Sequence, residues 1–357
     1  MPSTAIIGAG ALGGSLATHL RSKGCSVLLA GTANHPGMIP EVNAHQNKIK
    51  SNGTEYSVQT GGVTQAATKD HIFITVPSSG WEGVINSLAR FDLNGKTLIV
   101  VPGGGFTAML LAKWPQNKQK PYRIMELDTS PYAVRRGNGN IISIKDTKKT
   151  IAAACALTPA SDNFKQIAAQ FFPLELEWLG SPMEILMRRT GLPSHALASL
   201  AYQTQIDANQ QPYFYRTCVS HVTPQIATLE AEIRAICQAW GISFEPLLSI
   251  TNKRYGTNDS TFKELVETLP AYYQIRAPKG PLKNHRYVQE DMKGIAVLYF
   301  QLAQKAGVNT PTLRYIIERG SALADEDFMR TGWRLSEFGI GSNWEMHHIK
   351  GRLNGSI

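Results

Sequence analysis

The first half of the chain alternates short apolar runs with polar and amphipathic stretches. Each run has the length and β-branched content of a buried strand, and strands that alternate with helices are typical of a doubly wound parallel sheet. The predicted strands are residues 5–7, 26–30, 71–76, 97–101, 123–127 and 140–144, with 150–158 as one further short strand. This half is therefore predicted to be an α/β Rossmann dinucleotide-binding domain.

From about residue 164 onward, helical periodicity replaces the strand pattern. Apolar residues spaced i, i+3, i+4 and i+7 predict a helix through Ile226, Leu229, Ile233, Ile236, Cys237 and Trp240, ended by Gly241. A second helix holds Ile295, Leu298, Leu302 and Ala306 and ends at Gly307, and a third starts at Thr310 and Pro311. We expect a Rossmann NAD(P)-binding domain at residues 1–182 and an all-helical C-terminal domain at residues 183–357.

A glycine-rich segment follows the first predicted strand. Gly8, Gly10 and Gly13 form the pattern G-x-G-x-x-G where the strand should turn into a helix. In such a loop the glycines allow a tight turn, a close approach of the backbone to a pyrophosphate, and close packing of the helix. The backbone N–H groups of Ala11 and Leu12, at the helix start, would then face the phosphates. An ordinary glycine-rich turn is the alternative.

The turn after the second strand bears on the choice of cofactor. An NAD-preferring site usually carries Asp or Glu there for the ribose 2′-hydroxyl. This chain has Gly-Thr-Ala-Asn-His at residues 31–35 instead, so Thr32, Asn34 and His35 can donate to a 2′-phosphate, although no Arg is present to clamp it. NADP(H) is favoured and NAD(H) remains the alternative. Pro77 follows another strand end, where ligands of open α/β sheets bind, although an ordinary loop explains it equally well.

Composition narrows the class of protein. Of the 357 residues, 43% are hydrophobic and 18% are charged, and we find no apolar run long enough to cross a membrane. The four cysteines are widely spaced, which indicates free thiols in the cytoplasm and no metal site. The net charge is +9, with nine basic and three acidic residues between 113 and 149. No nucleic-acid-binding motif accompanies them, so attraction of anionic cofactor and substrates is the preferred interpretation.

A dinucleotide domain followed by a helical domain predicts hydride transfer to a substrate held between them, and such chemistry needs a proton donor. His195 is the candidate, because it lies at the start of the first helix after the domain boundary. A histidine there is also a common cap or packing residue. Asp291 lies before an apolar helix, where an acid is usually a cap; the functional alternative is that it orients His195 while Arg286 grips a substrate carboxylate.

At this point the chain resembles the opine dehydrogenases, and among them the opine synthases of plant tumours. The resemblance spans nearly the whole chain. Its most specific blocks are Ser-Pro-Tyr-Ala-Val-Arg-Arg at residues 130–136 and His-Arg-Tyr-Val-Gln-Glu-Asp at residues 285–291. Further matches are residues 8–13, 73–77, 214–216 and 307–311.

The resemblance implies reductive condensation of an amino acid with a 2-oxo acid through an imine that NAD(P)H reduces. It implies that His195 is the general acid/base, that Asp291 orients it, that Arg286 binds a substrate carboxylate and that Thr129 places the 2-oxo acid. An ion pair of Arg286 with Glu290 and a strand-end hydrogen bond of Thr129 are the structural alternatives. Arginine and pyruvate are the first-choice substrates, with 2-oxoglutarate second, for a monomer or homodimer without nucleic-acid or membrane partners.

The sequence alone leaves two other functions open, a reductase with a different substrate and a non-catalytic cofactor sensor. Ketopantoate reductases and glycerol-3-phosphate dehydrogenases also pair such a glycine loop with a helical domain, but they usually use a catalytic lysine, and no comparable lysine block stands out here. A non-catalytic NADP(H) sensor would require the catalytic residues to be missing. Because His195, Arg286 and Asp291 are all present, an enzyme is the preferred interpretation.

Overall fold

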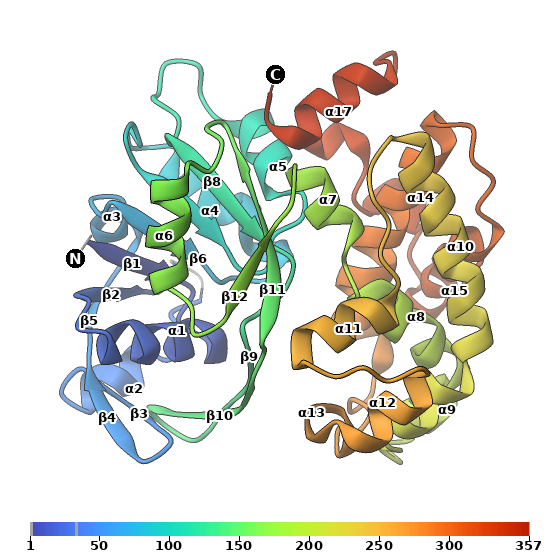
Figure 1. Cartoon of the computed structure of the whole chain (residues 1–357), viewed down its shortest axis with the longest axis horizontal. Coiled ribbons are helices and arrows are strands. Elements are labelled where there is room, and N and C mark those ends of the chain that lie inside the picture. Colours follow the sequence, from blue (N-terminus) through green and yellow to red (C-terminus); the bar gives the residue numbers. More distant parts are fainter. Residues whose placement is uncertain (1–2, 33–34, 357) are drawn as a thin grey trace. The chain divides into compact units, whose positions relative to one another are not determined.

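The computed structural model describes residues 3–32 and 35–356, which form two compact units (Figure 1). One unit runs to Leu186 and takes in the segment that begins at Leu353; the other is Met187–Arg352. The sequence predicted a single cut between residues 182 and 183. The C-terminal segment joins the first unit through long-range contacts that a local pattern does not reveal: the Asn354 side chain accepts a hydrogen bond from the Met183 N–H at 3.2 Å.

The first unit is built on an eight-stranded sheet with the strand order β12-β11-β8-β7-β6-β1-β2-β5. All neighbours in it pair in parallel except β8 and β11. The strands are β1 (Thr4–Ile7), β2 (Val27–Ala30), β5 (Gln59–Gly61), β6 (His71–Ile74), β7 (Thr97–Val100), β8 (Arg123–Leu127), β11 (Thr150–Ala156) and β12 (Glu175–Trp178). The predicted Rossmann fold is therefore confirmed.

Helices lie on both sides of this sheet, as the continuous apolar strands require (Figure 1). The residues of β1, β2, β7 and β8 are all buried, because side chains on both faces of each strand meet covering elements. The helices of this unit are α1 (Ala11–Ser22), α2 (Ile39–Ala44), α3 (Val63–Ala66), α4 (Trp81–Leu88), α5 (Phe106–Lys113) and α6 (Asp162–Gln170), and α7 (Pro182–Met187) leads into the second unit.

A second sheet of four strands corrects one prediction. Residues 140–144 were expected to extend the main sheet, but β10 (Ile141–Thr147) pairs instead with β9 (Tyr132–Arg136) and β3 (Lys48–Ser51), and β4 (Thr54–Ser57) completes the order β4-β3-β10-β9. The Gly-rich turn after β9 returns the chain as an antiparallel hairpin, which the sequence analysis did not recognise. Helix α1 contacts strands of both sheets.

The second unit is helical, as predicted. Its helices are α8 (Gly191–Ala201), α9 (Gln203–Asp207), α10 (Thr223–Ala239), α11 (Leu247–Tyr255), α12 (Phe262–Thr268), α13 (Pro270–Tyr273), α14 (Val297–Lys305), α15 (Pro311–Ala324), α16 (Phe328–Thr331) and α17 (Met346–Asn354). Two π-helical segments, Phe214–Val219 and Tyr287–Ala296, interrupt the α-helical pattern, and 3₁₀ turns cover Leu282–Asn284 and Leu335–Phe338. A further 3₁₀ turn, Ser78–Gly80, lies in the first unit. Gly241 (φ 59°) and Gly307 (φ 67°) adopt the left-handed conformation just after their helices.

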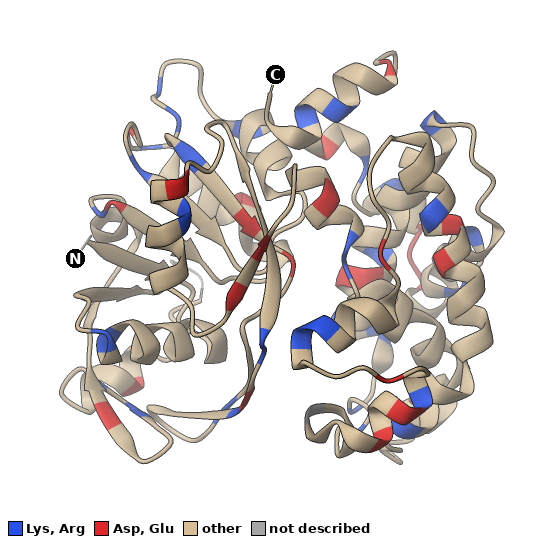
Figure 2. Ribbon diagram, viewed as in Figure 1, with Lys and Arg blue, Asp and Glu red and all other residues tan. Residues whose placement is uncertain are grey.

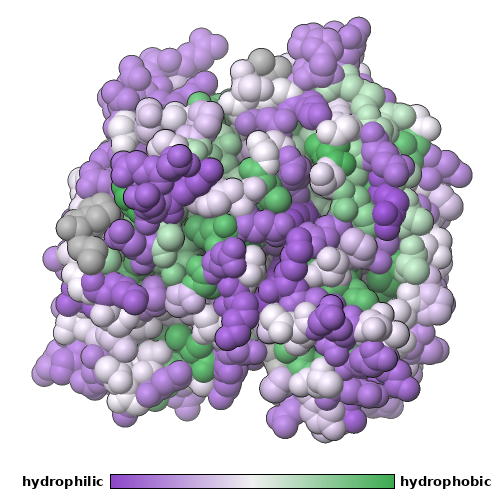
Figure 3. Space-filling model, in the orientation of Figure 1, coloured by the Kyte–Doolittle hydropathy of each residue, from purple (hydrophilic) through white to green (hydrophobic). Residues whose placement is uncertain are grey.

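The positive charge of residues 113–149 is partly compensated by acidic residues elsewhere in the first unit. Figure 2 shows acidic and basic residues interspersed along the ribbon. Within this range Lys113 pairs with Glu82 and Arg136 with Glu41, so part of the positive charge is compensated locally. Hydrophobic residues are scattered among hydrophilic ones on the face drawn in Figure 3. Among the described residues, none of the helices combines the length and the apolar character needed to cross a bilayer.

Candidate active site

The glycine loop between β1 and α1 is held by a neighbouring strand. Gly8 has φ 117°, and a Cβ atom there would lie 2.6 Å from Thr75 Oγ1. The Thr75 hydroxyl donates to the Gly8 carbonyl oxygen at 2.8 Å, directly after β6. A Cβ atom at Gly13 would collide with that same carbonyl oxygen. Gly8 and Gly13 are therefore required by the geometry of the loop itself, and Thr75, which the sequence analysis gave no role, fixes it.

Gly10 differs from the other two glycines, because a Cβ atom there would meet nothing within 4 Å. The residue is exposed and precedes helix α1 without a side-chain cap, so the N–H groups of Ala11 and Leu12 have no acceptor within the helix. Open space above glycine and unpaired N–H groups at a helix start together fit a pyrophosphate. These residues would hold the phosphates of a dinucleotide.

This contrast yields a paired prediction. We expect Gly10→Ala to fold as stably as the wild type but to weaken NADPH binding by about tenfold or more, because the new methyl group occupies the surface that the pyrophosphate must approach. We expect Gly13→Ala to lose about 1–3 kcal/mol of unfolding free energy, because its methyl group collides with backbone. Thermal unfolding and NADPH fluorescence titration measure the two effects. Unchanged NADPH affinity of the Gly10 variant would contradict the assignment.

The turn after β2 leaves no room for a side chain at its first residue. Gly31 directly follows the strand, and a Cβ atom on it would lie 2.9 Å from Pro36 Cα. The backbone N–H groups of Thr32 and His35 each donate a hydrogen bond to the other's carbonyl oxygen at 3.2 Å. The Thr32 side chain is half-buried at the turn. The predicted contact residue Asn34 lies outside the described residues. Pro77 is exposed just after β6, beside the Thr75 that fixes the glycine loop.

Thr129, the predicted 2-oxo acid residue, lies in the turn after β8, in the same unit as the glycine loop. Its Oγ1 accepts a hydrogen bond from Lys148 Nζ at 3.0 Å. Lys148 is 8% exposed and also donates to the Ser130 carbonyl oxygen. The sequence analysis counted Lys148 only as part of the basic stretch, because nothing local distinguishes a buried lysine from a surface one.

In the second unit, helix α8 and a π-helical segment bring together residues far apart in sequence. His195 is the fifth residue of α8, rather than its first as predicted, and Asp291 lies in the π-helix Tyr287–Ala296. The two segments approach closely at Gly191, where a Cβ atom would lie 2.5 Å from Asp291 Oδ1. π-Helical turns are frequent at functional sites because they re-aim side chains out of the regular helical register.

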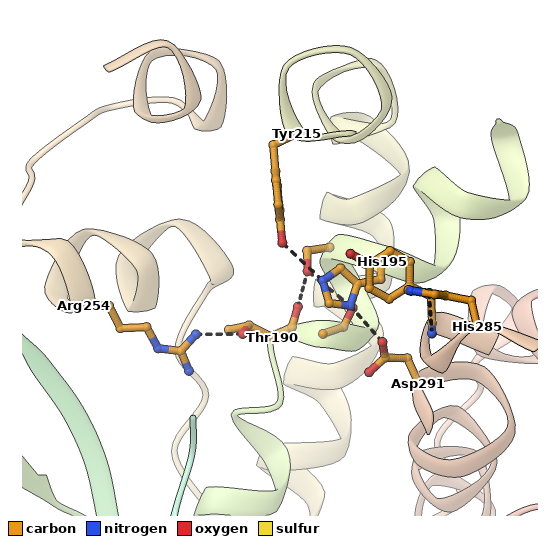
Figure 4. A network of polar contacts seen from close by, with 9 residues as sticks. Thr190, His195, Tyr215, Arg254, His285 and Asp291 are labelled. Atoms are coloured by element: carbon orange, nitrogen blue, oxygen red, sulfur yellow. Dashed lines mark hydrogen bonds and ion pairs between the residues drawn. The ribbon is translucent and has the colours of Figure 1, made fainter. Parts of the chain in front are cut away.

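His195 is bonded through both ring nitrogens (Figure 4). Its Nδ1 lies 2.8 Å from Asp291 Oδ2, and its Nε2 lies 3.2 Å from the Tyr215 hydroxyl. A carboxylate only accepts hydrogen bonds, so Nδ1 carries a proton and Nε2 is the nitrogen that gains or loses one. The Tyr215 hydroxyl accommodates both states, because it donates to the neutral imidazole and accepts from the imidazolium.

Aromatic rings surround this group of residues. The Tyr287 ring stacks on the His195 ring at a centroid distance of 3.9 Å, and the Tyr215 ring lies parallel to that of Tyr272 at 4.1 Å. His195, Asp291, Tyr215 and Tyr287 are all less than a tenth exposed. The rings fix the orientation of the imidazole and exclude water from it. Tyr215 falls in a block shared with the family, but the sequence alone assigned it no role.

Burial and charge act in opposite directions on His195. Burial lowers the pKa of His195, and the hydrogen bond and charge of Asp291 oppose this effect, while Arg286 adds to the lowering. Burial also raises the pKa of Tyr215 well above its ordinary value, so its hydroxyl stays protonated. Asp291 therefore keeps a buried imidazole able to take up a proton.

Arg286 lies at the start of the same π-helix, with its guanidinium carbon 5.8 Å from the centroid of the Tyr287 ring. The residue is exposed. Among the residues described, the side chain forms no hydrogen bond or ion pair, so Glu290 acts on it through its charge and not through the alternative pairing. An exposed guanidinium beside a buried His–Asp pair is well suited to bind a substrate carboxylate in a bidentate pair.

Comparisons with known proteins agree with this arrangement. The family model for ketopantoate reductase PanE/ApbA matches residues 4–107, and that for NAD/NADP octopine/nopaline dehydrogenase, alpha-helical domain, matches residues 178–324. The chain is 30% identical to Protein ocs of Agrobacterium vitis over 272 residues, covering 76% of this chain and 75% of that protein. It is 28% identical to vitopine synthase of Allorhizobium ampelinum over 374 residues and the full length of both.

The fold also matches a solved structure of octopine dehydrogenase with NADH and L-arginine, at 15% identity, with a TM-score of 0.78 and 98% of each chain covered. This likeness shows a shared fold, and the curated relatives establish the family. The resemblance seen in the sequence is thus confirmed. The chain belongs to the opine dehydrogenase family of NAD(P)-dependent oxidoreductases, which includes the opine synthases.

Proposed function

We propose that this enzyme joins the α-amine of an arginine-type L-amino acid to a 2-oxo acid and reduces the resulting imine to a secondary-amine dicarboxylate. Pyruvate is the first-choice 2-oxo acid and 2-oxoglutarate the second. The observation that carries the proposal is the His195–Asp291 pair with the exposed Arg286 beside it. Such a group can move a proton and hold a carboxylate, the two tasks this condensation requires.

In the condensation, the amine attacks the carbonyl carbon of the 2-oxo acid and the carbonyl oxygen must leave as water. His195, as imidazolium, donates the Nε2 proton to that oxygen, and the attacking amine gives up the second proton of the departing water, which leaves a protonated imine. Asp291 stabilises the charge on the ring through Nδ1. The Tyr215 hydroxyl lies on the Nε2 side, where the proton is exchanged. Burial of the pair keeps bulk water from competing for this proton.

Substrate carboxylates are held by two groups in this proposal. The Arg286 guanidinium binds one of them, and the Thr129 hydroxyl places the 2-oxo acid. A bound nicotinamide supplies the hydride that reduces the imine. The residues at Gly8, Gly10, Ala11, Leu12 and Gly13 hold its phosphates, as the open space at Gly10 supports.

We infer a preference for NADP(H) over NAD(H). The turn after β2 has no Asp or Glu whose carboxylate would repel a 2′-phosphate, and the packing of Gly31 against Pro36 leaves no room for one at its first residue. Thr32, Asn34 and Pro77 complete the proposed contacts at the strand ends. Location in the cytoplasm and a monomeric or homodimeric state remain predictions from the sequence.

The test is a matrix of amino acids against 2-oxo acids, run separately with NADPH and NADH. We expect NAD(P)H oxidation only when both substrates are present, with a lower KM for NADPH than for NADH. Mass spectrometry of the product must show the secondary amine. Oxidation with ketopantoate alone would favour the reductase suggested by the match at residues 4–107. NADPH binding without turnover on any pair would favour the sensor.

A further inference from the structure

Lys148 lies at the edge of the main sheet where Thr129 is found. Residue 148 is in the short turn between β10 and β11, and its backbone N–H donates to the Pro131 carbonyl oxygen at 3.0 Å. Strand β11 runs antiparallel to β8, so the start of β11 lies beside the carboxyl end of β8. In open α/β sheets ligands bind at this carboxyl edge, and the glycine loop after β1 lies at the same edge.

The bond between Lys148 and Thr129 has only one possible direction. An ammonium group has three donors and no acceptor, so Nζ must donate and Thr129 Oγ1 must accept. The single hydroxyl hydrogen of Thr129 therefore points elsewhere. Among the residues that the structure describes, Thr129 has no second hydrogen-bond partner, and its side chain is partly exposed. The hydroxyl hydrogen is thus free to be donated to an acceptor from outside the protein.

The same contact brings a positive charge to the hydroxyl. Lys148 is 8% exposed and its ammonium lies 3.0 Å from Thr129 Oγ1. A donor polarised by an adjacent cation binds an anionic acceptor more strongly than a neutral one. A carboxylate oxygen matches both features, whereas a ketone without a carboxylate would gain much less from the charge.

We propose that Lys148 determines specificity for the carboxylate of the 2-oxo acid, by holding the Thr129 hydroxyl as a donor and by adding a positive charge behind it. This inference rests on the proposed function, in which Thr129 places the 2-oxo acid. Lys148 acts through Thr129 and is therefore a positioning residue.

The test compares Lys148→Met with Lys149→Met. Lys149 is exposed and adjacent, so its replacement removes the same charge without touching Thr129. We expect Lys148→Met to raise the KM for pyruvate by about ten- to a hundredfold, because it removes a charge-assisted contact, with little change in the KM for arginine or NADPH. Lys149→Met should behave as the wild type. Equal effects of the two replacements, or an unchanged KM for pyruvate in Lys148→Met, would overturn the proposal.

Two further variants keep the test decisive if Lys148→Met folds poorly. Thr129→Val preserves shape but removes the hydroxyl, so it should raise the KM for pyruvate similarly, and Thr129→Ser should recover most of the loss. If Lys148 and Thr129 only stabilised the turn, all of these variants would lose thermal stability, and the KM for pyruvate would not rise in Thr129→Val and recover in Thr129→Ser. A KM for pyruvate that stays as high in Thr129→Ser as in Thr129→Val would contradict the role of the hydroxyl.

A binding measurement separates this inference from the proposed reaction. Calorimetric titration of pyruvate into the NADPH complex needs no amino acid and no turnover. If pyruvate binds the wild type more tightly than it binds Lys148→Met, the inference is supported. Absence of turnover with every amino acid would then contradict only the proposed function. If the wild type is active but binds pyruvate with the same affinity as Lys148→Met, the proposed function stands and the inference is overturned.

Discussion

Replacing His195 by asparagine is expected to lower kcat for the condensation by about 10²- to 10⁴-fold, the range that a positioned general acid contributes. Asparagine removes the proton that Nε2 exchanges but still offers a donor to Asp291, so the buried carboxylate keeps a partner. The affinity for NADPH should not change, because the glycine loop belongs to the other unit. Steady-state rates with arginine and pyruvate, together with NADPH fluorescence titration, measure both quantities.

The matched control is His221→Asn. His221 is an exposed histidine of the same unit, and it contacts Tyr202 rather than the His195 group. It should retain wild-type turnover. Comparable turnover of His195→Asn and the wild type would remove His195 from the mechanism, and loss of NADPH binding in that variant would show that the replacement disturbs more than proton transfer.

Asp291→Asn should produce the second large effect, and it should depend on pH. Burial lowers the pKa of His195, and the Asp291 charge opposes that lowering. Without the charge, the pKa of His195 falls further, so a smaller fraction of the enzyme carries the imidazolium at neutral pH. Condensation consumes that proton, so kcat should fall by about tenfold for each unit by which the pKa drops. The limb of the profile that declines toward high pH should shift to lower pH.

The pH profile of kcat for condensation measures this shift, and the reverse oxidation provides an independent check. Oxidation needs the neutral imidazole, so its rising limb should move to lower pH in the same variant. Glu326→Gln is the control, because it removes a carboxylate that pairs with Lys293 on the same π-helix at 2.7 Å. A profile of Asp291→Asn with the same midpoint as the wild type would contradict the electrostatic role.

Local sequence patterns predicted much of the architecture. The spacing of Gly8, Gly10 and Gly13 after an apolar run predicted the strand, the turn and the helix that follow, because the conformational demands of that loop are met by few residues. Helices α10 and α14 were predicted from apolar periodicity, and the glycine that follows each of them ends it as expected. These features depend on contacts within a few residues, which is why the sequence revealed them.

Long-range pairing accounts for what the sequence analysis missed. Residues 140–144, which belong to β10, were assigned to the main sheet, because strand propensity does not specify a partner. Thr75 was given no role because its bond to Gly8 joins residues 67 positions apart. Lys148 appeared as one lysine in a basic stretch, since its burial depends on how the turns around it fold.

The sequence by itself determined the two-part architecture, the dinucleotide loop and, through the blocks shared with the family, the candidate site residues. It could only suggest that Asp291 faces His195. Tertiary structure decided that contact, which joins residues 96 positions apart, and added Tyr215 on the second ring nitrogen. The physical reason is that periodicity and glycine geometry are local properties of the chain, whereas proton transfer depends on distances set by the packing of α8 against the π-helix.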